Sequence, residues 1–220
     1  VAALNALRRD ATQRFIEAVL ERRRGCPAPS EVQGLPALPA VVARDAAVRR
    51  ARPLLVVQSR ALADAELGDA LYWAPAHVDR ASLEREFAAR GPGMIYLRLP
   101  NMLGSAELTE IAAFACDHGA ELKGCVLTNV SQLGLELPGE LVADMNMNAW
   151  NSRTVELLRA QGVRRVTGSL ELTCAELSEM DLRGLERELI VYGRAELMTL
   201  RHCPLNARGG LAHVDCRLCD

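Results

Sequence analysis

Residues 93–130, "GMIYLRLPNMLGSAELTEIAAFACDHGAELKGCVLTNV", contain the pattern that decides the fold. The two apolar runs at 93–99 and 122–130 are typical of strands, and the stretch at 105–119 between them has helical spacing of its apolar residues. A helix between two buried strands indicates parallel pairing, because the chain needs a crossover to start the second strand in the same direction. Ser105 is the expected N-cap of that helix.

The same alternation extends along most of the chain. Further strands are predicted at 53–59, 70–75, 141–148, 164–172 and 187–194, and further helices at 80–90, 152–162 and 173–180. Near-continuous apolar strands that alternate with helices are typical of a parallel sheet covered on both faces. Thr173 is the expected N-cap of the helix over 173–180, with Glu176 as its capping-box partner.

Seven strands in this order predict an α/β fold, specifically a TIM-like (β/α) barrel. An open dinucleotide-binding sheet is less favoured, because "QSRALADAELG" after the first strand has no glycine-rich motif. No eighth strand is recognised up to residue 220, so we expect the barrel to be incomplete or irregularly closed.

Three regions are expected along the chain. Residues 1–24 predict an amphipathic N-terminal helix, residues 25–40 contain four prolines and two glycines and predict a linker, and residues 41–220 form the barrel-like domain. The chain begins inside a helical pattern and ends one residue after a cysteine pair. We therefore expect it to be a piece of a longer protein whose remainder is a partner of this domain.

Composition limits the class of protein. The 220 residues have a formal net charge of −2, which gives no global attraction to nucleic acid, although ten arginines lie within residues 1–53 and could contact phosphate. No apolar run is long enough to span a membrane, and the first residues lack the basic and apolar regions and the cleavage site typical of a secretory signal. Seven cysteines, an odd number, argue against a disulfide framework and for a cytoplasmic protein with reduced thiols.

Polar residues gather at the expected carboxyl ends of the strands, where barrel proteins place their reactive groups. Asn146 and Asn148 alternate with two methionines along one predicted strand, so either the amides or the methionines face the barrel axis. Asn151 either belongs to the predicted substrate-binding site or only caps the helix that follows it. The residues expected to bind substrate are Arg98, Asn101, Asn146, Asn148, Tyr192 and Arg194.

Candidate catalytic groups are few. Glu171 is the one carboxylate well placed for proton transfer, and His202 is a second, weaker candidate. No nucleophile elbow and no zinc-protease helix occurs. His118, at a helix C-terminus, is interpreted as structural, and Cys116 and Cys125 as small buried side chains.

Three cysteines gather in residues 201–220, "RHCPLNARGGLAHVDCRLCD". Cys203, Cys216 and Cys219 have the spacing C-x12-C-x2-C, and no helical pattern follows the pair as it would in a thioredoxin-type motif. Thiolates are the ligands that zinc and iron–sulfur clusters prefer. The stretch therefore predicts a metal site.

Several motifs resemble the peptidase U32 family, also called collagenase-like proteases. The most specific is "VYGRAELMTLRHCPLNA" (191–207) followed by "DCRLC" (215–219). "LNALRRDA" (4–11), "MNMNAWNS" (145–152) and "GSLELT" (168–173) are similar to other segments of the family and occur in the same order. The resemblance covers most of the chain.

The resemblance implies a barrel protein from a family historically classed as peptidases without a settled catalytic residue. Several of its branches carry a [4Fe–4S] cluster and modify RNA or ubiquinone. By position, Cys203, Cys216 and Cys219 would be cluster ligands. In many members the fourth cysteine lies further along the chain. In one branch it comes from the loop after the second strand, where this chain has His77 and no cysteine. The cluster can therefore be absent from this piece. Zinc is the alternative metal.

Three functions remain open from the sequence. The first is iron–sulfur-dependent modification of RNA or a small molecule by the longer protein. The second is genuine hydrolysis of peptide substrates, with Glu171 or His202 activating water. The third is a non-catalytic barrel that binds substrate for the rest of a larger protein.

Overall fold

The computed structural model describes residues 2–23, 53–194, 196 and 199. The chain divides into two units, residues 1–39 and 40–220. Helix α1 (Ala2–Arg23) is the described part of the first unit and confirms the predicted N-terminal helix. Its described side chains, those of residues 10–21, are all exposed. The predicted linker at 25–40 lies outside the described residues.

The second unit contains a parallel sheet whose seven strands follow one another in chain order. Each strand pairs with its neighbour in the sequence, as when Tyr72 lies opposite Tyr96. This order confirms the α/β fold and the parallel pairing expected from the crossovers. The strands are β1 (Val56–Ser59), β2 (Ala70–Trp73), β3 (Ile95–Arg98), β4 (Gly124–Leu127), β5 (Glu140–Ala143), β6 (Val163–Thr167) and β7 (Glu186–Glu188).

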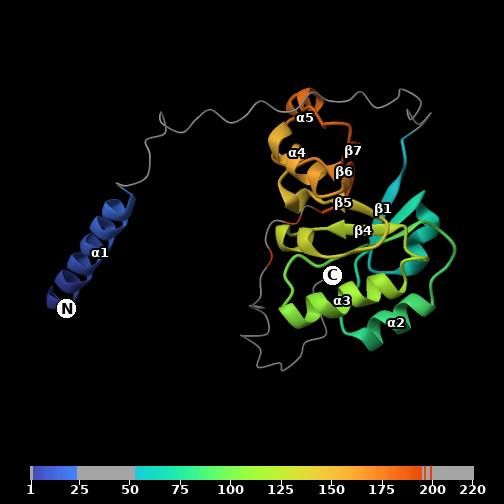
Figure 1. Cartoon of the computed structure of the whole chain (residues 1–220), viewed down its shortest axis with the longest axis horizontal. Helices are drawn as coiled ribbons and strands as arrows, with labels where there is room; N and C mark the ends of the chain where they lie inside the picture. The colour runs from blue at the N-terminus through green and yellow to red at the C-terminus, as the bar shows by residue number, and fades with distance from the viewer. Residues whose placement is uncertain (1, 24–52, 195, 197–198, 200–220) are drawn as a thin grey trace. The chain divides into compact units, whose positions relative to one another are not determined.

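All four helices predicted between the strands are present (Figure 1). They are α2 (Arg80–Ala88), α3 (Ser105–Asp117), α4 (Ser152–Ala160) and α5 (Cys174–Glu179). Short 3₁₀ helices occupy three of the connections: η2 (Leu62–Leu67), η3 (Val130–Gly134) and η4 (Met145–Met147).

The helix starts follow local capping chemistry. Thr173 caps α5, and its backbone N–H donates to the Glu176 carboxylate at 2.8 Å, so the predicted capping box is confirmed. The prediction for α3 is wrong by one residue. Gly104 is the N-cap and Ser105 the first helical residue, because the Glu107 carboxylate accepts the Gly104 N–H at 2.7 Å.

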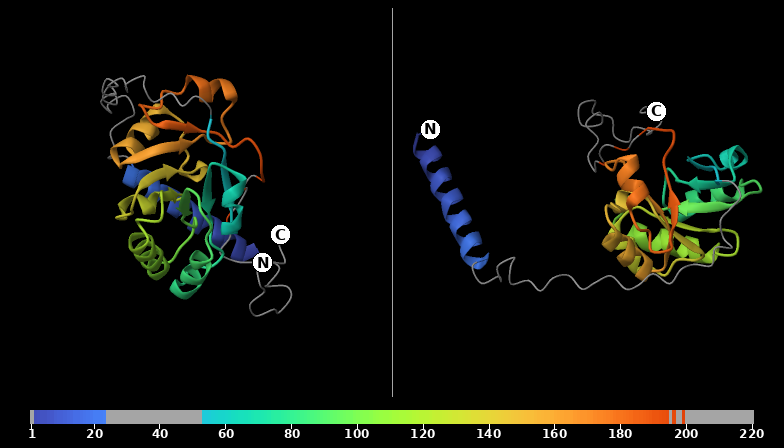
Figure 2. Two further views of the ribbon diagram at one scale, coloured as in Figure 1. Left: turned by 90° about the vertical axis from the view of Figure 1, so that its right-hand side faces the viewer. Right: turned by 90° about the horizontal axis from the view of Figure 1, so that it is seen from above.

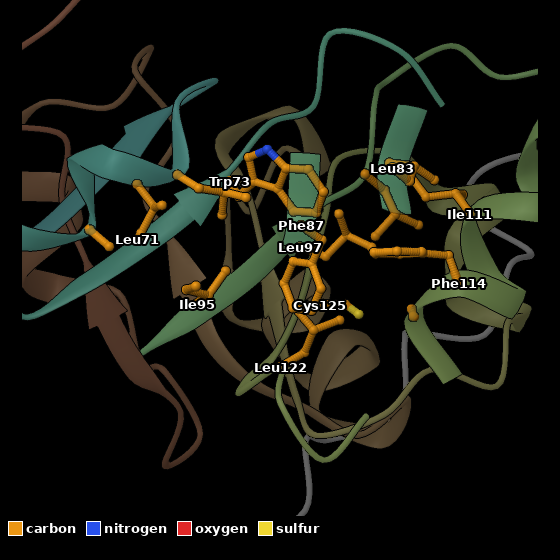
Figure 3. Packing of buried hydrophobic residues seen from close by; sticks show 14 residues of the cluster. Leu71, Trp73, Leu83, Phe87, Ile95, Leu97, Ile111, Phe114, Leu122 and Cys125 are labelled. Atoms are coloured by element: carbon orange, nitrogen blue, oxygen red, sulfur yellow. The ribbon is translucent and has the colours of Figure 1, made fainter. Parts of the chain in front are cut away.

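The largest apolar cluster packs helices α2 and α3 against one face of β2, β3 and β4 (Figure 3). The Trp73 ring stacks on Phe87 at 5.6 Å between centroids, and Phe114 meets Phe87 edge-on at 5.5 Å. Cys125 is buried in this cluster, as predicted. Cys116 is exposed, which contradicts the prediction, and its thiol donates to the Glu136 carbonyl at 3.3 Å.

The sheet curls into a half-barrel, which Figure 2 shows from two further sides. Tyr72 on β2 and Glu188 on β7 are joined by a 2.5 Å hydrogen bond. Strands five positions apart in a flat sheet would be separated by about 24 Å, so this bond requires strong curvature. Among the described residues β1 and β7 do not pair with each other, in agreement with the expectation of an incomplete barrel.

Strand β7 is shorter than the predicted strand over 187–194. Leu189, Ile190, Val191 and Tyr192 follow it without strand pairing and are exposed. Within the described residues β7 forms a strand pair only with β6, so this apolar run has no second strand to extend along.

Candidate functional site

Arg98 and Asp144 form the centre of a polar group at the carboxyl ends of the strands. Arg98 is the last residue of β3, and Asp144 directly follows β5. Nη2 and Nε of Arg98 lie 2.6 and 2.9 Å from Oδ2 of Asp144. Both side chains are about nine-tenths buried, at 11% and 8% exposure. This buried pair holds the arginine at the edge where parallel-barrel proteins bind ligands.

Asn146 reaches the same place from a turn, not from a strand. Oδ1 of Asp144 accepts the Met145 N–H at 2.6 Å and starts η4, and Asn148 ends it in the left-handed region at φ 49°. The predicted strand over 141–148 therefore stops at Ala143, and the expected alternation of asparagines and methionines is wrong. Asn148 is exposed on this turn.

Glu196 joins these residues from the segment that follows β7. Its Oε2 accepts from Asn146 Nδ2 at 3.2 Å and lies 3.7 Å from Arg98 Nη2, and its Oε1 accepts from the Thr199 hydroxyl. Asn101 Nδ2 in turn donates to that hydroxyl at 3.3 Å. We call Arg98, Asn101, Asp144, Asn146, Glu196 and Thr199 the rim cluster.

The rim cluster stabilises the charged form of Glu196. The hydrogen bond from Thr199 is the largest of the effects that lower the pKa of this carboxyl, followed by those of Asn146 and Arg98. Partial burial opposes them. Because the lowering effects win, this position favours a negative charge.

A cavity of about 240 Å³ adjoins the rim cluster at Asn101. The loops that form it are held by Gln132, whose Oε1 accepts the Thr128 N–H and whose Nε2 donates to the Pro100 carbonyl, both at 2.8 Å. The cavity combines amides, a hydroxyl and apolar side chains. Its lining residues are Asn101, Met102, Leu103, Leu108, Asn129, Ser131 and Gln132.

The other predicted site residues lie apart from the rim cluster or outside the described chain. Tyr192 and Arg194 are exposed. Glu171 is exposed as well, in the loop after β6, where its backbone N–H donates to Ser169 Oγ at 3.3 Å. Asn151 acts as the N-cap of α4, accepting two backbone N–H groups. Outside the described residues lie His202, Cys203, Cys216 and Cys219.

A second polar group fills the concave side of the half-barrel, and it was not anticipated from the sequence. Arg165 on β6 is buried and donates to the Tyr72 hydroxyl at 3.0 Å and to Glu186 at 3.2 Å. Tyr96 donates to Glu140 at 2.7 Å. We call Tyr72, Tyr96, Glu140, Arg165, Glu186 and Glu188 the inner network.

Burial and neighbouring carboxylates suppress ionisation of the two phenols. Desolvation is the main cause that raises the pKa of Tyr96 to about 12, and the bond to Glu140 adds to it. The pKa of Tyr72 is raised further, by burial first and by Glu188 second. A hint was present in the sequence, since Arg165 and Thr167 lie on either side of the apolar Val166 on β6 and therefore share one face.

Comparisons with models of known families, with curated proteins and with solved structures find no match to this chain. Within the described residues, no helix has both the length and the apolar character needed to cross a membrane. The same part of the chain brings together no three His, Cys, Asp or Glu side chains in an arrangement suited to a metal ion.

The groups of the rim cluster are suited to binding a polar ligand. Its arginine is already paired with a carboxylate, and its remaining groups are two amides, a hydroxyl and Glu196. Such groups bind and orient a polar ligand by hydrogen bonds. Glu171, the predicted proton-transfer group, does not belong to it.

Proposed function

We propose that this chain supplies the substrate-binding edge and the cysteine ligands of a U32-type enzyme, which modifies RNA or another polar substrate with an iron–sulfur cluster. One observation supports this most. Glu196 belongs to the "VYGRAEL" motif and Asn146 to the "MNMNAWNS" motif, fifty positions apart, and their side chains are hydrogen-bonded. Two segments that carry the resemblance thus lie together at the carboxyl edge of the sheet.

One of the three cysteines follows this contact closely in the chain. Cys203 is four residues after Thr199, so chain length alone limits the separation of their Cα atoms to about 14 Å. Three thiolates are a donor set that suits an iron–sulfur cluster, with a fourth ligand from elsewhere, and also suits zinc. When bound, a cluster supplies one-electron transfer.

The described residues would serve the substrate. Asn146 and Asn101 present amides that orient a polar group, and the buried Asp144 fixes the direction of the Arg98 guanidinium. Holding the substrate beside the cysteines is the contribution that the rim cluster makes in this proposal.

Metal analysis of the protein tests the cluster. We expect anaerobically purified protein to contain iron and sulfide, and Cys203→Ser, Cys216→Ser and Cys219→Ser each to lose them. The control is Cys174→Ser, an exposed cysteine at the start of α5, which should retain the iron. Zinc in place of iron would refute the cluster chemistry, and protein without either metal would refute the metal site altogether.

A second function, a half-barrel that only binds substrate, is favoured by one observation: the rim cluster contains no free acid–base pair. In that case Asn146→Ala should raise KM for the parent enzyme without lowering kcat. Peptide hydrolysis has a distinct outcome. Activity on a protein substrate that survives loss of all three cysteines and disappears in Glu171→Gln would favour the hydrolase.

A further inference from the structure

The Glu196 carboxylate lies where several hydrogen-bond donors converge. Asn146 Nδ2 at 3.2 Å and the Thr199 hydroxyl donate to it, and the Arg98 guanidinium is 3.7 Å away. Glu196 is itself one-third exposed, whereas Arg98 beneath it is 11% exposed. An amide, a hydroxyl and a guanidinium are the groups with which proteins recognise carboxylates and phosphates.

Hydrogen-bond donors, and not a net positive charge, stabilise a single anionic group at this position. The charges of Arg98 and Asp144 cancel. The site is therefore neutral without the Glu196 carboxylate and carries one negative charge with it. The lowered pKa of Glu196 agrees with this preference. Without an acceptor, the Asn146 amide would lose a hydrogen bond, which water or another anion must replace.

We propose that the substrate is anchored by an anionic group, a carboxylate or a phosphate, which takes the place of the Glu196 carboxylate on Asn146 and Arg98. This inference rests on the proposed role of the rim cluster in substrate binding. Glu196 then acts as an internal competitor for the anion site. The rest of the ligand can extend past Asn101 into the adjoining cavity, where Met102 and Leu103 offer apolar surface.

The competition has a measurable consequence. A ligand that binds only when Glu196 is displaced has an apparent affinity reduced by the fraction of molecules in which the site is open. Removing the charge of Glu196 should therefore tighten anion binding, whereas a purely structural Glu196 predicts unchanged or weaker binding.

Calorimetric titration of the full chain at constant ionic strength tests the proposal, with inorganic phosphate in one arm and acetate in the other. We expect Glu196→Gln and Glu196→Ala to bind at least one of these anions about tenfold more tightly than the unaltered chain. The matched control is Glu179→Gln, an exposed carboxylate at the end of α5, which should leave the affinity unchanged. Arg98→Lys keeps the charge but removes the planar fork and should weaken binding.

Two results would overturn the proposal. One is the absence of saturable binding of either anion to the unaltered chain and to both Glu196 variants. The other is an affinity in the Glu196 variants that does not rise, measured on samples whose circular dichroism matches that of the unaltered chain. Tightening in the phosphate arm alone, in the acetate arm alone or in both identifies which anion the site accepts.

The anion site and the cluster can fail separately. The titrations are repeated on Cys203→Ser, whose rim cluster is unaltered. If protein that contains no iron binds the anion, the anion site is supported and only the cluster chemistry is refuted. If iron-loaded protein binds the anion with the same affinity whether or not Glu196 is substituted, only the anion site is refuted.

Discussion

The Tyr72 hydroxyl donates a hydrogen bond to the Glu188 carboxylate at 2.5 Å, although their strands stand five positions apart in the sheet. Arg165, on the strand between β5 and β7, donates to the same hydroxyl at 3.0 Å. The phenol therefore connects the second strand to the last two across the concave side. The curvature of the half-barrel and the pairing of these buried groups depend on each other.

Replacing Tyr72 by phenylalanine should destabilise the protein by about 1–3 kcal/mol, because Arg165 loses an acceptor and Glu188 a donor in a buried setting. Urea unfolding measures the change in the free energy of unfolding. Tyr192→Phe is the control, since Tyr192 is 97% exposed and its change should stay within about 0.5 kcal/mol. Equal effects of the two substitutions would contradict the role of the inner network.

Stability should fall as the pH rises above about 9. The pKa of Cys125 is raised by burial from 9 to about 12, and that of Tyr96 from 10 to about 12. Between these values the unfolded chain has released the proton and the folded chain still binds it. Each such group thus stabilises the fold fully below its unfolded pKa and loses that contribution, by about 1.4 kcal/mol per pH unit, as the pH approaches 12.

The contribution of Tyr96 can be isolated with Tyr96→Phe. The free energy of unfolding, measured by urea titration at a series of alkaline pH values, should decline less steeply in this variant above pH 10. An identical slope in the two proteins would show that the phenol ionises equally in the folded and unfolded chains.

Asp144→Asn should cost about 2–3 kcal/mol of stability, because it leaves the Arg98 charge nearly buried. Among the described residues, the carboxylate that remains as its partner is the more distant Glu196. The matched control is Glu156→Gln, which breaks a pair with Arg159, itself 47% exposed, and should cost under about 1 kcal/mol. Chemical denaturation of both variants provides the comparison. A loss for Asp144→Asn no larger than the control would mean that the Arg98 pair adds no net stability.

Phe114→Ala should destabilise the sheet domain by about 3–5 kcal/mol, since it opens a cavity where Phe87 and Trp73 pack on α3. Phe15→Ala provides the control on helix α1, where the ring is 69% exposed and a change near zero is expected. Thermal unfolding followed by circular dichroism gives both values. A small effect at Phe114 would contradict the close packing of this cluster.

The elements of the fold were largely predictable. Strands at 95–98 and 124–127 and the helix between them lie inside the predicted ranges, because apolar periodicity and capping act over a few neighbouring residues. Errors occurred where a local hydrogen bond competed with the pattern. The Asp144 side chain turned residues 145–147 into a 3₁₀ helix, although the apolar alternation favoured a strand.

The candidate site was predicted only in part. Arg98, Asn101 and Asn146 were expected at strand ends, and the structure brings these three into one rim cluster. Glu196 was not expected there, because no pattern near it specifies a partner fifty residues away. Asn148, Tyr192 and Arg194 share the same sequence signal and do not join the cluster. Strand β5 ends at Ala143 and β7 at Glu188, so these residues lie beyond the strand ends.

The sequence by itself determined where the strands and the helices between them lie along the chain, and which residue types are available at the carboxyl edge, because each of these depends on neighbours along the chain. Only the tertiary structure decided the contacts between Tyr72 and Glu188 and between Asn146 and Glu196. These pairs depend on how strongly the sheet curls and on the path of the chain after β7. Both are set by packing among residues far apart in sequence, where local periodicity has no influence.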